Sequence, residues 1–141
     1  MYLDSAYIAK YYLNEWDAEA VRSLIHHAEL LVSSEWSMVE VACAFHRHLR
    51  EGQLTIHHYQ ALSKAFRQHV QQELWTLVPL NSRILARATA AMGSLPSGIF
   101  LRSGDAVHLV SAQDAGETEV WTSDRRMLAA APHFGLMGRS A

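Results

Sequence analysis

The chain has a single cysteine, Cys43, which excludes an intramolecular disulfide. Cys43 falls within an apolar pattern of helical spacing, and a free cysteine in such a setting behaves as a small apolar side chain. We therefore expect Cys43 to pack in the core of a protein that works in a reducing compartment, the cytoplasm.

Long hydrophobic runs are also missing. No apolar stretch approaches the roughly 18 residues of a membrane span, and no basic segment followed by an apolar run marks a secretion signal. The formal net charge is −2, so the composition lacks the positive excess that many nucleic-acid-binding proteins carry. We expect a cytoplasmic protein with no membrane partner, in which any nucleic-acid contact depends on local groups of side chains.

The composition that is present belongs to an ordinary globular protein. The chain has 141 residues, of which 50% are hydrophobic and 18% charged. A chain of this length buries roughly two-thirds of its unfolded surface, which is enough for a full core. Because the sequence has no repeat, low-complexity segment or linker, we expect one domain over residues 1–141.

Short apolar segments alternate with amphipathic helical segments along the chain. The predicted strands are 1–4, 30–33, 74–78, 119–122 and 135–137. The predicted helices are 6–14, 17–28, 37–50, 55–72, 81–93, 105–115 and 125–131. This alternation predicts the α/β fold class, with a parallel sheet covered on both faces, and ligands of such sheets bind beyond the carboxyl ends of the strands.

Four carboxylates stand at or just inside predicted helix starts: Asp4, Glu40, Asp105 and Asp124. Each also has a purely structural explanation. The three aspartates suit N-cap positions, and Ser37 with Glu40 has the spacing of a capping box. For each residue taken alone, helix capping and membership of a shared site both remain open.

Taken together, the four residues favour a metal site. Three of the five aspartates of the chain, with Glu40, stand at helix starts that we expect along one edge of the sheet. Converging carboxylates repel one another, and a bound divalent cation removes that repulsion. Hard oxygen ligands suit Mg²⁺ or Mn²⁺, and nearby helix N-termini favour a phosphate. The pattern predicts a carboxylate-bound Mg²⁺ site for phosphoryl chemistry.

Four stretches of sequence carry a resemblance to a known family. They are YLDSAYIAKYY, SEWSMVEVACAFHR, LRSGDAVHLVSA and TSDRRMLAAAPHFGL. In their order and spacing they resemble the PIN-domain ribonucleases, in particular the VapC-type toxins of toxin–antitoxin pairs. The resemblance covers essentially the whole chain.

This resemblance implies a single α/β/α domain around a parallel sheet of about five strands. It implies a Mg²⁺-dependent endoribonuclease toxin that hydrolyses phosphodiester bonds in RNA, namely tRNA or rRNA, and leaves a 5′-phosphate and a 3′-hydroxyl. It also implies a cognate antitoxin protein that silences the enzyme, and a homodimer or toxin–antitoxin hetero-oligomer.

Residue by residue, Asp4, Glu40, Asp105 and Asp124 match the acidic metal-binding positions of the family and are the catalytic candidates. The resemblance implies that Asp4 and Asp105 hold Mg²⁺ (or Mn²⁺), and that Glu40 and Asp124 complete the site. One position departs from the family pattern. Ala6 stands where relatives often carry Ser or Asn, which removes a possible hydrogen bond beside the metal.

Basic residues near this edge are candidates for binding RNA phosphates, namely Arg102, Arg125 and Lys10. Arg125 has the alternative of a solvated helical turn, and Lys10 that of an ion pair with Asp17 or Glu15.

Two hydroxyl residues, Thr122 and Ser123, could orient a carboxylate or a water, or simply bond to backbone. His108 follows Asp105 by three residues and is expected to be a structural hydrogen-bonding residue. Aromatic residues could stack bases, line an antitoxin groove or pack in the core: Tyr7, Tyr11, Tyr12, Trp16 and Trp36.

Two other functions are compatible with parts of this pattern. A catalytically silent binding module would keep the fold and a partner groove, and Ala6 and the missing basic surface favour it. A haloacid-dehalogenase-like phosphatase needs a second Asp two residues after the first, where this chain has Ala6, so the sequence argues against it.

Overall fold

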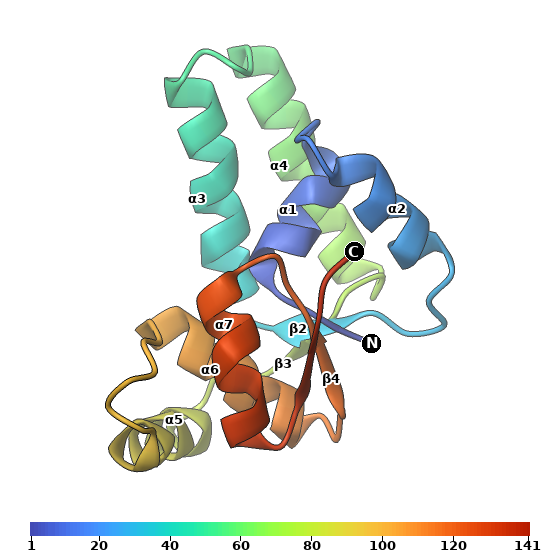
Figure 1. The fold of residues 1–141 in the computed structure, drawn as a ribbon. Coiled ribbons are helices and arrows are strands. Elements are labelled where there is room, and N and C mark those ends of the chain that lie inside the picture. Colours follow the sequence, from blue (N-terminus) through green and yellow to red (C-terminus); the bar gives the residue numbers. More distant parts are fainter.

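The computed structural model describes residues 1–141 and contains five short strands in one sheet (Figure 1). The strands are β1 (Tyr2–Leu3), β2 (Val32–Ser34), β3 (Thr76–Val78), β4 (Glu119–Trp121) and β5 (Met137–Arg139). Their order in the sheet is β3-β2-β1-β4-β5, and every neighbouring pair is parallel. The predicted α/β fold with a five-stranded parallel sheet is confirmed.

Seven α-helices and one 3₁₀ turn surround the sheet. They are α1 (Ser5–Tyr12), α2 (Ala18–His26), α3 (Ser37–Arg50), α4 (Ile56–Gln71), α5 (Ser82–Ser94), α6 (Ser103–Asp114), α7 (Arg125–Ala130) and η1 (Ala131–Phe134). Helices α3 and α4 project from the sheet as a pair, while α5, α6 and α7 lie on its other side (Figure 1). None of these helices has the length and apolar character needed to cross a membrane.

Strand β1 shows how the sheet divides the core. Tyr2 and Leu3 are both fully buried, and successive side chains of a strand point to opposite faces. Tyr2 belongs to a hydrophobic cluster with residues of α5, α6 and α7, whereas Leu3 belongs to a second cluster with residues of α1 to α4. Both faces of the sheet are therefore covered, as is usual for parallel sheets.

Most helices begin where the polar residues of the sequence predict. The side chains of Asp4, Thr55, Asn81 and Asp124 are N-caps that accept backbone N–H groups of the first turn of α1, α4, α5 and α7. Helix α6 begins two residues earlier than predicted, so Asp105 lies within its first turn and is not its N-cap.

The prediction for Cys43 is wrong, because its side chain is exposed. Helix α3 buries Val41 and Phe45, which are four residues apart and share one face. Cys43 lies midway between them in sequence and therefore points to the opposite side. The apolar pattern of this segment contains more apolar residues than one helix face can bury.

Candidate functional site

The strand order creates a topological switch point between β1 and β4. From β1 the chain crosses to β2 and β3 on one side of the sheet, and then returns to β4 and β5 on the other. In α/β sheets a crevice forms at the carboxyl ends of the two strands where the direction reverses. Asp4 follows β1 and Thr122 follows β4, so both residues stand at this crevice.

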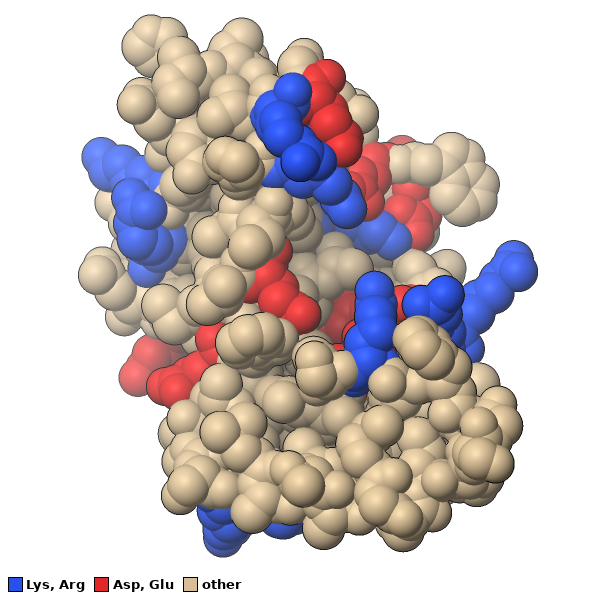
Figure 2. All heavy atoms as spheres, turned by 90° about the vertical axis from the view of Figure 1, so that its left-hand side faces the viewer, with Lys and Arg blue, Asp and Glu red and all other residues tan.

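Three of the four predicted carboxylates line one cavity of about 260 Å³: Asp4, Glu40 and Asp105. They come from three separate segments, namely the end of β1 and the first turns of α3 and α6. Asp124 joins them through Arg102, which lines the cavity and contacts both Asp105 and Asp124. Figure 2 shows acidic atoms inside a hollow of this face, with basic side chains along its margins.

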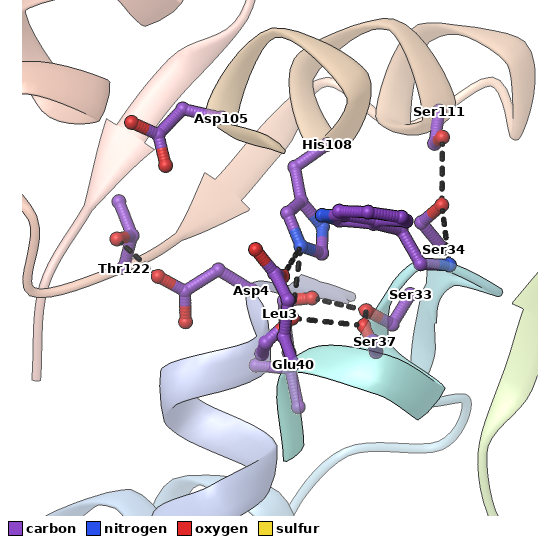
Figure 3. Close-up of polar contacts among 12 residues, drawn as sticks. Leu3, Asp4, Ser33, Ser34, Ser37, Glu40, Asp105, His108, Ser111 and Thr122 are labelled. Atoms are coloured by element: carbon purple, nitrogen blue, oxygen red, sulfur yellow. Dashed lines mark hydrogen bonds and ion pairs between the residues drawn. The ribbon is translucent and has the colours of Figure 1, made fainter. Parts of the chain in front are cut away.

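Asp4 uses its two carboxylate oxygens differently (Figure 3). Oδ1 accepts the backbone N–H of Tyr7 at 2.9 Å, and Oδ2 accepts the hydroxyl of Thr122 at 2.5 Å. Both partners are uncharged and the residue is buried. Burial raises the pKa of Asp4 above its ordinary value of 3.8, and the hydrogen bonds from Thr122 and Tyr7 offset this only in part. Asp4 therefore caps α1 and is also an acid whose charged form a bound cation would stabilise.

Glu40 is held by a buried polar network behind the cavity (Figure 3). Its Oε2 accepts the hydroxyl of Ser5 and lies 2.9 Å from Nε2 of His108. A carboxylate can only accept, so Nε2 of His108 carries the proton of this contact. Nδ1 of the same ring lies 2.9 Å from Oη of Tyr2. Burial raises the pKa of Glu40, but the hydrogen bond and charge of His108, with the Ser5 hydroxyl, outweigh burial and hold that pKa below its ordinary value.

The capping box predicted at Ser37 and Glu40 does not form. Helix α3 has Trp36 at its N-cap position and no side-chain cap. The Ser37 hydroxyl instead lies 3.2 Å from Ser5 Oγ and 2.7 Å from Ser33 Oγ. These contacts compete with capping because they join α3 to Ser33 within β2 and to Ser5 at the start of α1.

Arg102 pairs with the other two carboxylates, Asp105 and Asp124. Its Nε and Nη2 donate to Oδ2 and Oδ1 of Asp105 at 2.9 and 3.1 Å, and Nη2 also lies 2.5 Å from Oδ2 of Asp124. The other oxygen of Asp124 accepts the N–H of Arg126 and caps α7. The hydrogen bonds and charge of Asp105, with Asp124, raise the pKa of Arg102 despite some burial.

The sequence of the chain also matches the model of a known protein family. The sequence model of the PIN domain matches residues 1–132. The chain belongs to the PIN domain family. No curated protein sequence matches it at a comparable level.

Solved structures share the fold of this PIN domain. VapC20 of Mycobacterium tuberculosis, described as a sarcin–ricin loop cleaving toxin, superposes with a TM-score of 0.70 at 11% identity, over 92% of this chain and 93% of that one. A chain of a toxin–antitoxin complex from Klebsiella pneumoniae has a TM-score of 0.63 at 17% identity, over 94% of this chain and 92% of that one. At these identities the likeness concerns the fold.

The donor chemistry of this PIN domain fits a hard divalent cation. Asp4, Glu40 and Asp105 offer carboxylate oxygens to one cavity, and Asp4 is buried without a charged group against it. As the side chains are placed, no group of three or more His, Cys, Asp and Glu residues lies close enough together to hold a metal ion. Arg102 provides the positive charge beside Asp105 and Asp124.

Lys10 forms the ion pair with Asp17 that the sequence left open. Its Nζ lies 2.6 Å from Oδ2 of Asp17 and donates to the hydroxyl of Ser123 at 2.9 Å, and the residue is buried. An RNA contact of Lys10 stays a prediction, and it would require this pair to open. Arg125 is exposed in the first turn of α7. The Thr122 hydroxyl makes both kinds of contact that the sequence left open, since it donates to Asp4 and accepts the backbone N–H of Asp124.

The five aromatic candidates separate by burial. Tyr7 is fully buried, and Tyr11, Tyr12 and Trp36 are partly buried against the two hydrophobic clusters. Trp16 is 100% exposed and lines a second cavity, which shares Glu15 and Arg47 with the carboxylate cavity. Trp16 is therefore the most accessible ring of this set.

Sequence reasoning missed Arg47 and Ser5 as residues of the site. Arg47 lines the carboxylate cavity, and it follows Glu40 by seven residues, which is two turns along the same face of α3. That spacing could have identified it. The contact of Ser5 with Glu40 joins residues 35 positions apart, and no local pattern indicates such a pair.

Proposed function

We propose that this PIN domain is a Mg²⁺- or Mn²⁺-dependent endoribonuclease and the toxin of a toxin–antitoxin pair. The observation that carries the proposal is the convergence of Asp4, Glu40 and Asp105, from three separate segments, on one cavity at the switch point of the sheet. Membership of the PIN family supports a nuclease. The fold shared with VapC20, which is described as cleaving the sarcin–ricin loop, supports RNA as the substrate.

In this proposal Asp4 and Asp105 hold the metal, and Glu40 and Asp124 complete the site. When bound, the cation lowers the pKa of a coordinated water and neutralises charge on the phosphate. Thr122 keeps Asp4 in place through its hydroxyl. His108 and Ser5 orient Glu40 and favour its ionised form, which suits a ligand of a cation.

The RNA would be bound by side chains at the margins of the cavity. Arg102 and Arg125 are proposed to contact phosphates, and Arg47 can do the same from α3. Trp16 is proposed to stack an unpaired base next to the carboxylate cavity. Ser123 supports this side of the site by accepting a hydrogen bond from Lys10.

The proposed partners are a cognate antitoxin and a second copy of the chain, in the cytoplasm. The Klebsiella pneumoniae relative was solved as a toxin–antitoxin complex, which supports an antitoxin partner. Light scattering of the purified chain would test the homodimer, and a small neighbouring gene for a DNA-binding protein would identify the antitoxin.

The deciding experiment is cleavage of an RNA panel by the purified chain. The panel contains tRNAs and rRNA fragments, including a sarcin–ricin loop, and is run with Mg²⁺, with Mn²⁺ and with a chelator. We expect discrete cuts that need the metal and disappear in Asp4→Asn and Asp105→Asn. Asp114→Asn is the matched control, because Asp114 lies on the same helix as Asp105 but pairs with Arg83 and Arg87. Undiminished cleavage by the Asp4 and Asp105 variants would refute the proposal.

A catalytically silent binding module remains the second candidate. Ala6 lines the carboxylate cavity and offers no hydrogen bond to a metal-bound group, and Arg102 already occupies two of the carboxylates. This candidate predicts no turnover of any RNA in the panel. Metal binding by calorimetry together with metal-dependent turnover would exclude it.

A further inference from the structure

Every carboxylate of the proposed metal site has a partner within the protein. Asp4 and Glu40 are held by groups that are themselves buried, since Thr122, Ser5 and His108 each expose 9% or less of their surface. Asp105 and Asp124 share one partner, the guanidinium of Arg102. The site therefore keeps an excess of negative charge, and Arg102 is the counter-ion of two of its four carboxylates.

Arg102 engages the oxygens that a metal would need. It binds both oxygens of Asp105 through its fork, at 2.9 and 3.1 Å, and the one oxygen of Asp124 that does not cap α7. A bidentate guanidinium–carboxylate pair uses the same lone pairs that coordinate a hard cation. Arginine and metal cannot both hold these two carboxylates in this way.

The side chain of Arg102 is also free to leave. It is 54% exposed, whereas Lys10, which is held by Asp17 next to the site, has an 8% exposed side chain. The backbone of Arg102 is anchored separately, because its carbonyl accepts the N–H of Ala106 in the first turn of α6. The guanidinium can therefore swing out without unfolding the helix start.

We propose that Arg102 is an internal counter-ion that competes with the divalent cation for Asp105 and Asp124. The inference rests on the proposed function, since it takes these carboxylates as metal ligands. Each metal-binding event must displace the guanidinium. The apparent affinity for the metal is therefore the affinity of the free carboxylates multiplied by the fraction of molecules in which Arg102 is released. The same displacement would free Arg102 for the phosphate contact proposed above.

Calorimetry with Mg²⁺ alone tests this competition on the full chain. Arg102→Gln should bind Mg²⁺ about threefold to tenfold more tightly than the wild type, because exposed ion pairs of this kind are modest in strength. In chelator the same variant should melt at a lower temperature, and Mg²⁺ should raise that temperature more than in the wild type.

Two further variants separate competition from a general effect of charge. Arg102→Lys keeps the charge but loses the planar fork, so competition predicts tighter Mg²⁺ binding here as well. Arg125→Gln removes a nearby positive charge that does not hold these carboxylates, and it should leave the affinity within twofold of the wild type. Equal tightening in Arg102→Gln and Arg125→Gln, with none in Arg102→Lys, would overturn the proposal in favour of simple repulsion.

The outcomes also distinguish this inference from the proposed function. If the wild type binds Mg²⁺ and cleaves RNA while Arg102→Gln binds Mg²⁺ no more tightly, the competition is refuted and the nuclease stands. If no variant binds Mg²⁺, the metal site itself is refuted and the competition with it. Mg²⁺ binding by Arg102→Gln but not by the wild type would support the competition in a form in which Arg102 prevents metal binding completely.

Discussion

The two oxygens of Asp4 contact different groups, and so do those of Asp124. In each residue Oδ1 accepts backbone N–H at a helix start, while Oδ2 points to Thr122 or to Arg102. One carboxylate can therefore cap a helix and belong to the site at the same time. Because Asn caps helices about as well as Asp, Asp→Asn variants at these positions preserve the helix start and remove the charge alone.

The raised pKa of Asp4 predicts a pH-dependent metal affinity. Without metal, the folded protein keeps a proton on Asp4 above the ordinary value of 3.8, because burial disfavours the charged form. The free energy of unfolding in chelator should therefore fall as pH rises from 3.8 through the raised pKa. Mg²⁺ needs the ionised form, so its affinity should weaken at acidic pH and its binding should release a proton.

Calorimetry in two buffers of different ionisation enthalpy measures that proton release. The proton count should be larger at pH values near the raised pKa of Asp4 than well above it. A count that stays the same across this pH range would contradict the assignment.

Gly104 is predicted to be essential for the placement of Glu40. A Cβ added there would lie 2.8 Å from Oε1 of Glu40 and 3.0 Å from Nε1 of Trp36, which is the one buried side-chain polar atom without a hydrogen-bond partner. Gly104→Ala must shift the Glu40 carboxylate or the Trp36 ring, and a shift of Glu40 strains the contacts of its Oε2 with Ser5 and His108. We expect Mg²⁺ affinity and RNA cleavage to fall severalfold, with no gain in stability.

Gly93→Ala is the matched control for that variant. Gly93 also lies in a helix, α5, and a Cβ there would meet nothing within 4 Å. An exposed helical Gly→Ala change stabilises by roughly 0.5 to 1 kcal/mol. Urea unfolding of both variants would expose the contrast, and an equal gain in stability at Gly104 with unchanged Mg²⁺ affinity would count against the steric argument.

At the scale of elements, the pair of Lys10 and Asp17 ties together three segments. Lys10 lies in α1, Asp17 precedes α2, and Ser123 follows β4 and contacts both of them. The pair therefore joins the first helical layer to the strand end that carries Asp124. Its burial makes it a structural contact next to the site.

Asp17→Asn should destabilise the protein by roughly 1 to 3 kcal/mol at neutral pH, because it leaves the buried Lys10 without a countercharge. Burial raises the pKa of Asp17, but the hydrogen bond and charge of Lys10 outweigh burial and hold it below 3.8. The stability that the pair contributes is therefore present above pH 3.8 and lost as pH falls through the lower folded pKa.

Urea titrations of the wild type and Asp17→Asn across this pH range test both statements. The difference between the two proteins should shrink at acidic pH. Glu119→Gln is the control, because its partly exposed pair with Arg139 should contribute less than about 1 kcal/mol. A difference of the same size at every pH would contradict the role of the pair.

At the scale of the whole molecule, one sheet separates two hydrophobic clusters, and β1 contributes a residue to each. This shared sheet is the reason to propose that residues 1–141 form a single domain. We predict one cooperative unfolding transition. Fluorescence of Trp75 in one cluster and amide exchange of α6 beside the other should report the same free energy of unfolding, and two separate transitions would argue for two folding units.

The two cavities that meet at Glu15 and Arg47 give the molecule one continuous surface from the carboxylates to Trp16. Base stacking on an aromatic ring contributes about 1 to 3 kcal/mol. Trp16→Ala should therefore raise the KM for RNA about fivefold or more and leave the melting temperature unchanged, since the ring is fully exposed. Trp16→Phe should restore most of the affinity, and an unchanged KM in Trp16→Ala would remove Trp16 from the RNA path.

Local patterns were sufficient to predict the fold class and the order of strands and helices. They also singled out four carboxylates, three of which line one cavity. Periodicity identifies α3 within its observed bounds, Ser37–Arg50, and polar residues before apolar segments identify the caps of α4 and α5. These features depend on neighbours in sequence, which is why composition and spacing suffice to find them. The prediction that Cys43 is buried was wrong because an apolar pattern does not show which of its residues face the core.

The sequence by itself determined the kinds of groups that meet at the carboxyl edge of the sheet, because strand ends and helix starts are encoded locally. Only the tertiary structure decided their partners. Arg102, a candidate for phosphate contact, bridges Asp105 and Asp124, and His108 reaches Glu40 across 68 positions of sequence. Such pairings depend on which helices pack side by side, and that is set by the burial of the whole apolar surface.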